Sequence, residues 1–172
     1  IWDIQKITGA SIGTLGLNSK KRIPYDFKSN LTTPDVIESH KVLNQLHKFG
    51  YEKVIFEASS IGLHQKRLHP LKFDIIAFSN LSNDHLDYHK TLENYKLSKL
   101  MLFKDHIKKN SIAVVNADSK YSKFFVECCE INNIRVLDYG KYGRYVKIKS
   151  IQYFKNKIKV EILFKKKIIS LK

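Results

Sequence analysis

Four short, unbroken runs of apolar residues constrain the fold of this chain more than any other feature. Strands of a parallel sheet are buried on both faces, so they read as continuous apolar runs rather than as an alternation of polar and apolar residues. Segments with helical spacing separate the runs, which is the order expected when helices connect parallel strands. The pattern predicts an α/β fold, a mostly parallel sheet with helices on both faces, with strands at residues 53–58, 73–79, 111–116 and 134–139.

The predicted helices also have recognisable ends. Thr33 is a suitable N-cap, Pro34 suits the first helical position, and Gly50 is a plausible stop for the first helix. Further helices are predicted at about residues 91–103 and 120–131.

The pattern changes after Gly143, where short runs at residues 145–154, 157–164 and 168–172 are separated by turn-like residues. Such runs predict a small antiparallel β meander. A chain of 172 residues has room for one domain of this kind. We expect about residues 1–143 to form its parallel α/β part and about residues 144–172 its antiparallel part.

Composition excludes several classes of protein. The chain is 43% hydrophobic and 27% charged, which is typical of a globular protein. No apolar run approaches the roughly 20 residues that span a bilayer, so no membrane is expected as a partner. The net charge of +15 indicates an anionic ligand, but no nucleic-acid-binding motif accompanies it, so no nucleic acid is expected either. Cys128 and Cys129 are adjacent and offer no disulfide framework, which favours the reducing cytoplasm.

Both ends favour a segment of a longer protein. The chain opens on Ile1 rather than Met, in a stretch of helical character at residues 1–9, and stops at Lys172 directly after an apolar run. No cap or terminator marks either end, so we expect a truncated domain.

Polar clusters follow the first three predicted strands: EASS at residues 57–60, NLSNDHLD at residues 80–87 and NAD at residues 116–118. In open α/β sheets, ligands bind beyond the carboxyl ends of the strands. We therefore expect one composite site, although loops after strands are commonly polar simply because they are exposed.

Glu57 and Lys99 each have two interpretations. A carboxylate that ends an apolar strand is either solvated or aimed at a cation, and Mg²⁺ takes oxygen ligands of this kind. Lys99 falls within an apolar stripe of the helix predicted at residues 91–103. It either lays its stem on the core with its amine in water, or it is chemically available as a neutral amine. A neutral amine can add carbon dioxide to give a carbamate, which is an oxygen ligand for a hard metal.

His85 and His89 are separated by a segment that reads as a loop, so they do not form the helical histidine pair of a zinc protease. No cysteine lies nearby, which argues against structural zinc. Asp84 and Asp87 are candidates to cap the following helix.

Two glycine-containing segments are not phosphate-binding loops. GASIGTLG at residues 9–16 lacks the Lys-Ser/Thr pair that such a loop needs, and DYGKYG at residues 138–143 fails the same test. The apolar interior of the first predicts a buried strand that enters a turn. The chain therefore contains no P-loop.

Taken together and in this order, IGTLG, LTTPD, EASSIGLHQKR, FSNLSNDHLDYH, YKLSK and NAD resemble the central domain of the Mur ligases, of the MurE type. The resemblance runs over nearly the whole chain, and residues 57–67 and 80–99 make it specific. It implies an ATP-dependent ligase of peptidoglycan synthesis that adds a diamino acid, meso-diaminopimelate or L-lysine, to UDP-N-acetylmuramoyl-L-alanyl-D-glutamate. ATP would convert the D-glutamate carboxylate to an acyl phosphate, from which the incoming amine displaces phosphate.

The resemblance also implies roles for single residues. Glu57 matches a Mg²⁺ ligand on the nucleotide side, His85 a ligand of a second Mg²⁺, and Lys99 the lysine that the family carboxylates to hold that metal. These three are the predicted catalytic residues. The residues that match those binding the UDP-muramoyl dipeptide are Thr32, Thr33, Ser59, Gln65 and Arg67.

The chain departs from the family in three respects. Leu31 and Ile61 stand where many members have Asn and His. The family's P-loop is expected upstream of Ile1, so we expect the isolated chain neither to bind ATP with ordinary affinity nor to turn over.

Two alternative functions stay open. One is a ligase resembling folylpolyglutamate synthetase, against which the muramoyl-side segments LTTPD and EASSIGLHQKR argue. The other is a catalytically dead module that binds a nucleotide sugar. The sequence does not indicate which diamino acid is added or what the oligomeric state is.

Overall fold

The computed structural model describes residues 4–171, which form two compact units. The first unit contains the described residues up to Leu71 together with Glu93–Leu102. The second contains Lys72–Leu92 and the described residues from Phe103 onward. Each unit has a β-sheet of its own.

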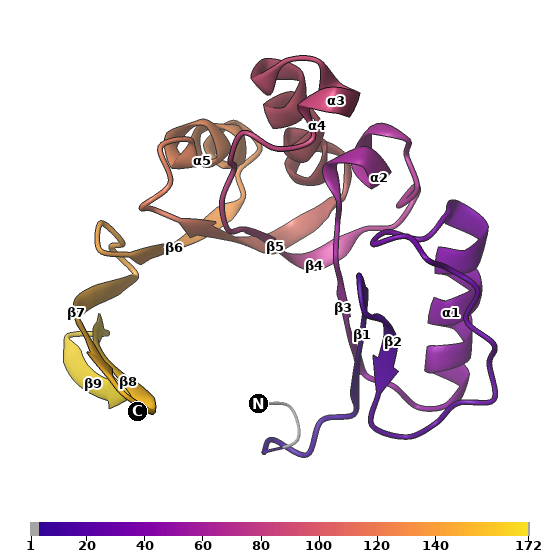
Figure 1. Ribbon diagram of the computed structural model, residues 1–172, viewed down its shortest axis with the longest axis horizontal. Helices are drawn as coiled ribbons and strands as arrows, with labels where there is room; N and C mark the ends of the chain where they lie inside the picture. Colours follow the sequence, from indigo (N-terminus) through magenta and orange to yellow (C-terminus); the bar gives the residue numbers. More distant parts are fainter. Residues whose placement is uncertain (1–3, 172) are drawn as a thin grey trace. The chain divides into compact units, whose positions relative to one another are not determined.

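A three-stranded sheet organises the first unit. β1 (Gly9–Gly13) pairs antiparallel with β2 (Gly16–Ser19) and parallel with β3 (Lys53–Phe56). α1 (Val36–Lys48) lies along one side of this sheet (Figure 1). Apolar side chains from the sheet and the helix form one buried cluster, made up of Ala10, Ile12, Ile23, Val42, Leu46 and Tyr51.

The ends of α1 only partly match the prediction. The N-cap is Asp35, whose side chain accepts a hydrogen bond from Glu38 N at 2.9 Å. The prediction of Thr33 as the N-cap is wrong, because Thr33 is fully buried and its hydroxyl hydrogen-bonds to another segment. The predicted stop is confirmed: Gly50 has φ +73° and its N–H donates to His47 O at 3.0 Å.

Two further helices contribute to the first unit. α2 (Ser60–His64) follows β3 almost at once and was not predicted, because its short sequence carries a glycine and too few residues to show a period. α4 (Leu92–Asp105) agrees with the helix predicted at about residues 91–103. The helical character expected at residues 1–9 lies partly outside the described residues, and Ile4–Lys6 form a turn instead of a helix.

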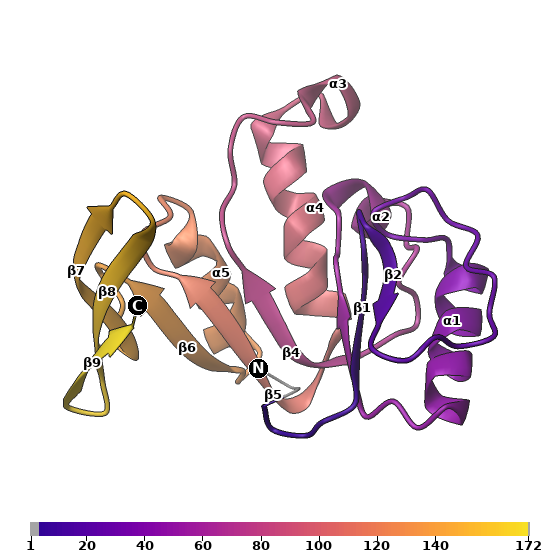
Figure 2. The same ribbon diagram turned by 60° about the horizontal axis from the view of Figure 1, so that its bottom comes forward.

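The second unit contains a six-stranded sheet in the order β4–β5–β6–β7–β8–β9. β4 (Phe73–Phe78), β5 (Ile107–Asn116) and β6 (Arg135–Gly140) are parallel neighbours, as the arrows in Figure 2 show. α5 (Ser122–Ile131) packs against β5 and β6. Its Phe125 stacks on Phe78 with the ring centroids 3.9 Å apart.

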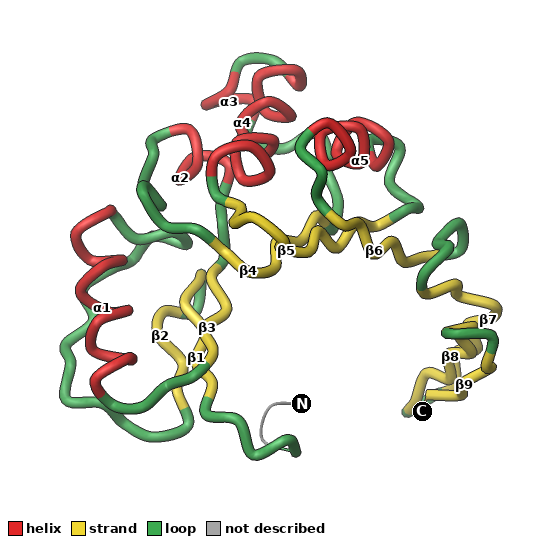
Figure 3. The backbone as a smooth tube through the Cα atoms, turned by 180° about the vertical axis from the view of Figure 1, so that it is seen from behind, coloured by secondary structure: helices red, strands yellow, loops and turns green. Residues whose placement is uncertain are grey.

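The predicted antiparallel meander is confirmed, and it continues the same sheet. β7 (Val146–Phe154) begins parallel to the end of β6 and then pairs antiparallel with β8 (Lys157–Phe164). β8 pairs antiparallel with β9 (Lys167–Leu171), which closes the series (Figure 3).

The predicted fold class, α/β with a mostly parallel sheet followed by antiparallel strands, is confirmed. The grouping of strands differs from the expectation of one sheet, because β3 pairs with β1 whereas β4 begins the second sheet. Both are edge strands of their sheets, and Ile55 on β3 and Ile75 on β4 are 56% and 61% exposed. Within residues 4–171, these two strands are therefore not buried on both faces. No helix in the same range has the length and apolar character needed to cross a bilayer.

Candidate functional site

The carboxylate of Glu57, one residue beyond β3, is held by the turn between β1 and β2. Thr14 lies in this turn, and its backbone N–H and its hydroxyl donate to Glu57 Oε2 at 2.8 and 3.0 Å. Glu57 N in turn donates to Ile12 O at 2.8 Å, so the backbone of Glu57 continues the pairing with β1. A Cβ on Gly13 would collide with the Glu57 side chain, and glycine therefore leaves room for the carboxylate.

Thr33 is the buried centre of the polar contacts around Glu57. Its hydroxyl oxygen accepts a hydrogen bond from Ser59 N at 2.8 Å. The same oxygen lies 2.8 Å from Glu57 O and 3.0 Å from Ser59 Oγ, which are acceptors for its single proton. Gly62 of α2 makes this packing possible, because a Cβ there would lie 2.6 Å from Thr33 Cβ.

Arg67 is tied to the same centre through its guanidinium group. Nη1 donates to Thr33 O at 3.0 Å, Nε donates to Gln65 Oε1 at 3.0 Å, and Nη2 donates to the same Gln65 oxygen. An arginine carries further N–H groups beyond these three, so Arg67 retains donors for an anionic ligand.

These contacts join most of the predicted site residues into one hydrogen-bonded network. Thr32 Oγ1 lies 3.0 Å from Thr14 Oγ1, which links Thr32 to the Glu57 carboxylate. We name the network the Glu57 cluster, and it consists of Thr14, Thr32, Thr33, Glu57, Ser59, Gln65 and Arg67. Sequence reasoning missed Thr14, although the IGTLG motif that contains it was the available signal.

Lys99 belongs to the first unit. It is half-buried on α4, and its Nζ lies 5.1 Å from the centroid of the Tyr95 ring one turn earlier. A lysine that covers an aromatic ring with its stem and ammonium group fits the first interpretation, in which Lys99 lays its stem on the core and keeps its amine in water. Its carboxylation stays a prediction.

His85 belongs to the second unit and lies in an exposed segment. Its side chain is 46% exposed, its φ is +55°, and its backbone N–H donates to Asp84 Oδ1 at 2.8 Å. The loop predicted between His85 and His89 contains one helical turn, α3 (Leu86–His89), because Lys90 N and His89 N donate to Leu86 O and His85 O. His89 is buried whereas His85 is exposed, so the two histidines do not act as a pair.

The metal site predicted at Glu57, His85 and Lys99 stays a prediction. Within residues 4–171, no group of three or more His, Cys, Asp or Glu side chains is placed to hold a metal ion.

Two of the three polar clusters that follow strands lie at the same sheet edge. Asn116 Nδ2, at the end of β5, donates to Ser79 O, just beyond β4, at 2.8 Å. The third cluster, EASS, belongs to the sheet of the first unit, so the three clusters do not follow neighbouring strands of one sheet as the sequence predicted.

A family model described as the Mur ligase middle domain matches residues 1–172. The chain belongs to the Mur ligase family as a middle domain. It is 36% identical over 162 residues to the UDP-N-acetylmuramoyl-L-alanyl-D-glutamate–2,6-diaminopimelate ligase of Chelativorans sp. (strain BNC1), which covers 94% of this chain and 33% of that relative. The chain thus spans about one third of the length of the curated relatives it matches.

Solved structures agree with this assignment. A structure of a UDP-N-acetylmuramoyl-L-alanyl-D-glutamate–2,6-diaminopimelate ligase superposes with a TM-score of 0.84 at 26% identity, covering 99% of this chain and 34% of that one. The apo form of L. casei FPGS superposes with a TM-score of 0.63 at 8% identity, covering 96% of this chain and 46% of that one. The second likeness shows a shared fold alone. The resemblance predicted from the motifs, to a Mur ligase of the MurE type, is confirmed.

The DYGKYG segment of this Mur ligase middle domain ends β6 and enters a loop, residues 141–145, whose backbone donates to two carboxylates. Asp118 accepts hydrogen bonds from Tyr142 N and Lys141 N, both at 2.9 Å, and these bonds lower the pKa of its carboxyl group. Asp138 accepts from Tyr145 N at 2.7 Å and from Arg144 N at 2.9 Å. Burial would raise the pKa of Asp138, but these bonds and the Arg144 side chain hold it below its ordinary value.

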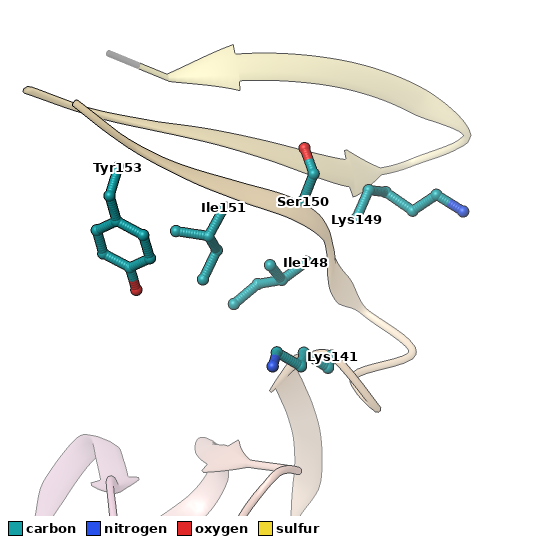
Figure 4. Close-up of a pocket in the computed structure, with 6 residues that line it drawn as sticks. All are labelled: Lys141, Ile148, Lys149, Ser150, Ile151 and Tyr153. Carbon is teal, nitrogen blue, oxygen red and sulfur yellow. The ribbon is translucent and has the colours of Figure 1, made fainter.

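A pocket of about 420 Å³ lies over the meander of the Mur ligase domain, and none of the predicted site residues lines it. Figure 4 shows Ile148, Ile151 and Tyr153 pointing to one side of β7, the side on which Lys141 lies, and Ser150 pointing to the other side. The pocket therefore shares no residue with the Glu57 cluster.

Proposed function

We propose that this chain is the middle part of an ATP-dependent ligase that adds meso-diaminopimelate to UDP-N-acetylmuramoyl-L-alanyl-D-glutamate. The ligase acts in the cytoplasm as a step of peptidoglycan synthesis, and so contributes to cell shape and division. The relatives that support the proposal are named as 2,6-diaminopimelate ligases, and one of them is 36% identical over 94% of this chain. The names favour diaminopimelate over L-lysine.

The Glu57 cluster is the observation that carries the proposal. It gathers, on strand ends and a short helix, a carboxylate, hydroxyl groups and a guanidinium whose orientations are already fixed by hydrogen bonds. Binding an anionic substrate to groups that are fixed beforehand avoids most of the cost of ordering side chains. In the proposed ligase, Arg67 and Gln65 bind the anionic part of the UDP-muramoyl dipeptide, together with Thr32, Thr33 and Ser59.

Magnesium fits the residues of the first unit. Glu57 is exposed, and its carboxylate is the hard oxygen ligand that Mg²⁺ prefers while keeping several waters. Glu57 would hold one ion on the nucleotide side, and the resemblance assigns a second ion to Lys99, once the lysine is carboxylated, and to His85. When bound, Mg²⁺ supplies neutralisation of the charge that develops as a phosphoryl group is transferred.

The chain's own residues contribute positioning rather than a nucleophile. In the proposed reaction, the γ-phosphoryl group of ATP passes to the D-glutamate carboxylate and ADP leaves. The amine of diaminopimelate then attacks the acyl phosphate, loses a proton and expels phosphate. Arg67, Thr32 and Ser59 hold the substrate during both steps, because reactions of this kind are accelerated mainly by orientation and electrostatic stabilisation.

An assay of the full-length protein tests the proposal. The protein is incubated with UDP-N-acetylmuramoyl-L-alanyl-D-glutamate, ATP, Mg²⁺ and either meso-diaminopimelate or L-lysine, and ADP and the muramoyl tripeptide are quantified. We expect equal amounts of ADP and tripeptide with diaminopimelate and much less with lysine. Binding of the UDP-muramoyl dipeptide without any product contradicts the proposal in favour of a catalytically dead module. In a parallel incubation with a folate substrate and glutamate in place of the muramoyl dipeptide and diamino acid, addition of glutamate to the folate contradicts the proposal in favour of a folylpolyglutamate synthetase.

A further inference from the structure

The IGTLG motif is conspicuous in the sequence, and the proposed function does not use it. Its structure is a β-hairpin turn: Gly13 of β1 faces Gly16 of β2, and Thr14 and Leu15 form the connection. Leu15 is 94% exposed, whereas the backbone and side chain of Thr14 both face the Glu57 carboxylate. The donors of Thr14 are therefore directed at Glu57, and the turn does not form a phosphate-binding loop.

Thr14 holds one oxygen of the Glu57 carboxylate with two donors. The amide is 2.8 Å and the hydroxyl 3.0 Å from Oε2. Among residues 4–171, no hydrogen bond or ion pair engages Glu57 Oε1. Hydrogen bonds to a charged acceptor are stronger than neutral ones, so two of them on a single oxygen restrict the rotation of an otherwise exposed side chain.

The proton of the Thr14 hydroxyl also defines the direction of the next contact. Because that proton goes to Glu57 Oε2, the Thr14 oxygen is the acceptor in its 3.0 Å contact with Thr32 Oγ1, and Thr32 donates. The contacts thus run in one direction, from the Thr32 hydroxyl to the Thr14 hydroxyl and on to the Glu57 carboxylate.

Gly13 gives a second, steric observation at the same point. A Cβ at residue 13 would overlap the Glu57 side chain, and it would lie 2.9 Å from Glu57 Cβ. The Glu57 side chain therefore lies directly against the backbone of β1, where the Thr14 amide reaches its carboxylate. Gly13 and Thr14 of the motif therefore both define the position of the Glu57 carboxylate.

We propose that Thr14 is a positioning residue of the ligase: it orients the Glu57 carboxylate toward a divalent cation and couples it to Thr32 on the substrate side. This rests on the proposed function for the roles of Glu57 and Thr32. The orientation of the carboxylate itself rests on the contacts of Thr14 and Gly13.

The test compares Thr14→Val, which removes the hydroxyl and keeps the shape, with Thr14→Ser, which keeps the hydroxyl. Both are made in the full-length protein, with Thr8→Val as a matched control near the opposite end of β3, where Thr8 O accepts from Glu52 N and Lys53 N. We expect Thr14→Val to raise the Mg²⁺ concentration that gives half-maximal ligation about tenfold, the low end for losing a hydrogen bond to a charged group. Thr14→Ser and Thr8→Val should stay within about twofold of wild type.

Crystal structures of the same variants supply a readout that does not depend on activity. We expect the Glu57 carboxylate to leave its position beside the turn in Thr14→Val and to keep it in Thr14→Ser. If wild type ligates and Thr14→Val matches it in Mg²⁺ dependence, the positioning role is overturned and the proposed function stands. Equal losses in Thr14→Val and Thr14→Ser also overturn it, since the hydroxyl is then not the cause.

The two failures can be told apart. Absence of ligation by the wild-type protein contradicts the proposed function alone, and the crystal structures then decide the positioning role. A carboxylate that stays beside the turn in Thr14→Val overturns the inference whatever the activity.

Discussion

The Glu57 cluster and the segment around His85 are both parts of the predicted site, but they are held in different ways. Residues of the Glu57 cluster are far apart in the sequence. Their hydrogen bonds join the segments that directly follow β1, β3 and α2 to the segment before α1. The His85 segment, residues 82–87, is exposed, and its hydrogen bonds include short-range ones such as Asp84 N to Ser82 O at 2.9 Å and His85 N to Asp84 Oδ1 at 2.8 Å.

The difference teaches which part of the site is fixed before any ligand binds. Non-local hydrogen bonds around the buried Thr33 restrict the Glu57 cluster to one arrangement. Short-range contacts at an exposed segment open at little cost in free energy. We therefore expect the Glu57 cluster to act as a rigid binding surface and the His85 segment to adapt when a ligand arrives.

The largest expected effect is that of Glu57→Gln in the full-length protein. The amide keeps the shape and accepts from Thr14 N, but it removes the negative charge proposed to hold Mg²⁺. We expect kcat to fall roughly 10²–10³-fold, the range seen when one electrostatic contact of a transition state is removed. ADP formation in the ligase assay measures it.

Glu52→Gln is the matched control for this change. The Glu52 carboxylate accepts a hydrogen bond from Thr8 N at 3.3 Å and lies outside the cluster. Its kcat should equal that of wild type. A Glu57→Gln enzyme as active as the control would show that the cluster has no role in metal binding.

A smaller effect is expected on the free energy of unfolding, and it should differ between the two regions. Thr33→Val removes a fully buried hydroxyl and leaves Ser59 N without its acceptor, so we expect a loss of about 1–3 kcal/mol in the free energy of unfolding. His85→Ala, in the exposed segment, should change it by less than about 0.5 kcal/mol. Urea unfolding of the full-length protein measures both, and equal losses would remove the contrast between the regions.

The smallest effect concerns the loop fixed by Asp138. Its pKa is lowered in the folded protein, so the ionised carboxylate stabilises the fold above the unfolded pKa of about 3.9 and this contribution is lost as pH falls through the folded pKa. We expect Asp138→Asn to be about 1 kcal/mol less stable than wild type at neutral pH, with the gap closing in acid.

Urea unfolding between neutral pH and acid checks the loop prediction. Asp26→Asn serves as the control, because Asp26 is exposed and its ion pair with Lys28 is 3.6 Å long. A gap between wild type and Asp138→Asn that is the same in acid as at neutral pH would mean that the charge of Asp138 does not fix the loop.

The sequence predicted the strands well because a buried strand appears in the sequence as a run of apolar residues. The apolar runs that became β4, β5 and β6 were identified to within four residues at each end, and so was the meander. Their grouping was not predicted, because nothing in an apolar run says which strand it will pair with. β3 reads like β4, yet it pairs with β1.

Most residues of the site were predicted from the sequence, but the hydrogen bonds that join them were not. Motifs identified Thr33 and Glu57, but only the fold shows that the Thr33 hydroxyl bonds to Glu57 O rather than capping α1. Thr14 was missed because a turn threonine has no distinctive pattern, and its contact with Glu57 depends on the β1–β3 register. Long-range hydrogen bonds of this kind leave no local signal in the sequence.

Calorimetric binding of UDP-N-acetylmuramoyl-L-alanyl-D-glutamate to the full-length protein, without ATP, tests the central claim most directly. Arg67→Lys loses the forked contacts to Thr33 O and Gln65 and the planar group that remains for the ligand. We expect it to weaken binding at least about tenfold, while His85→Ala and the neighbouring control Lys66→Arg stay within about twofold. Wild-type affinity in Arg67→Lys, or an equal loss in His85→Ala, would contradict the claim that the Glu57 cluster is the preformed binding surface.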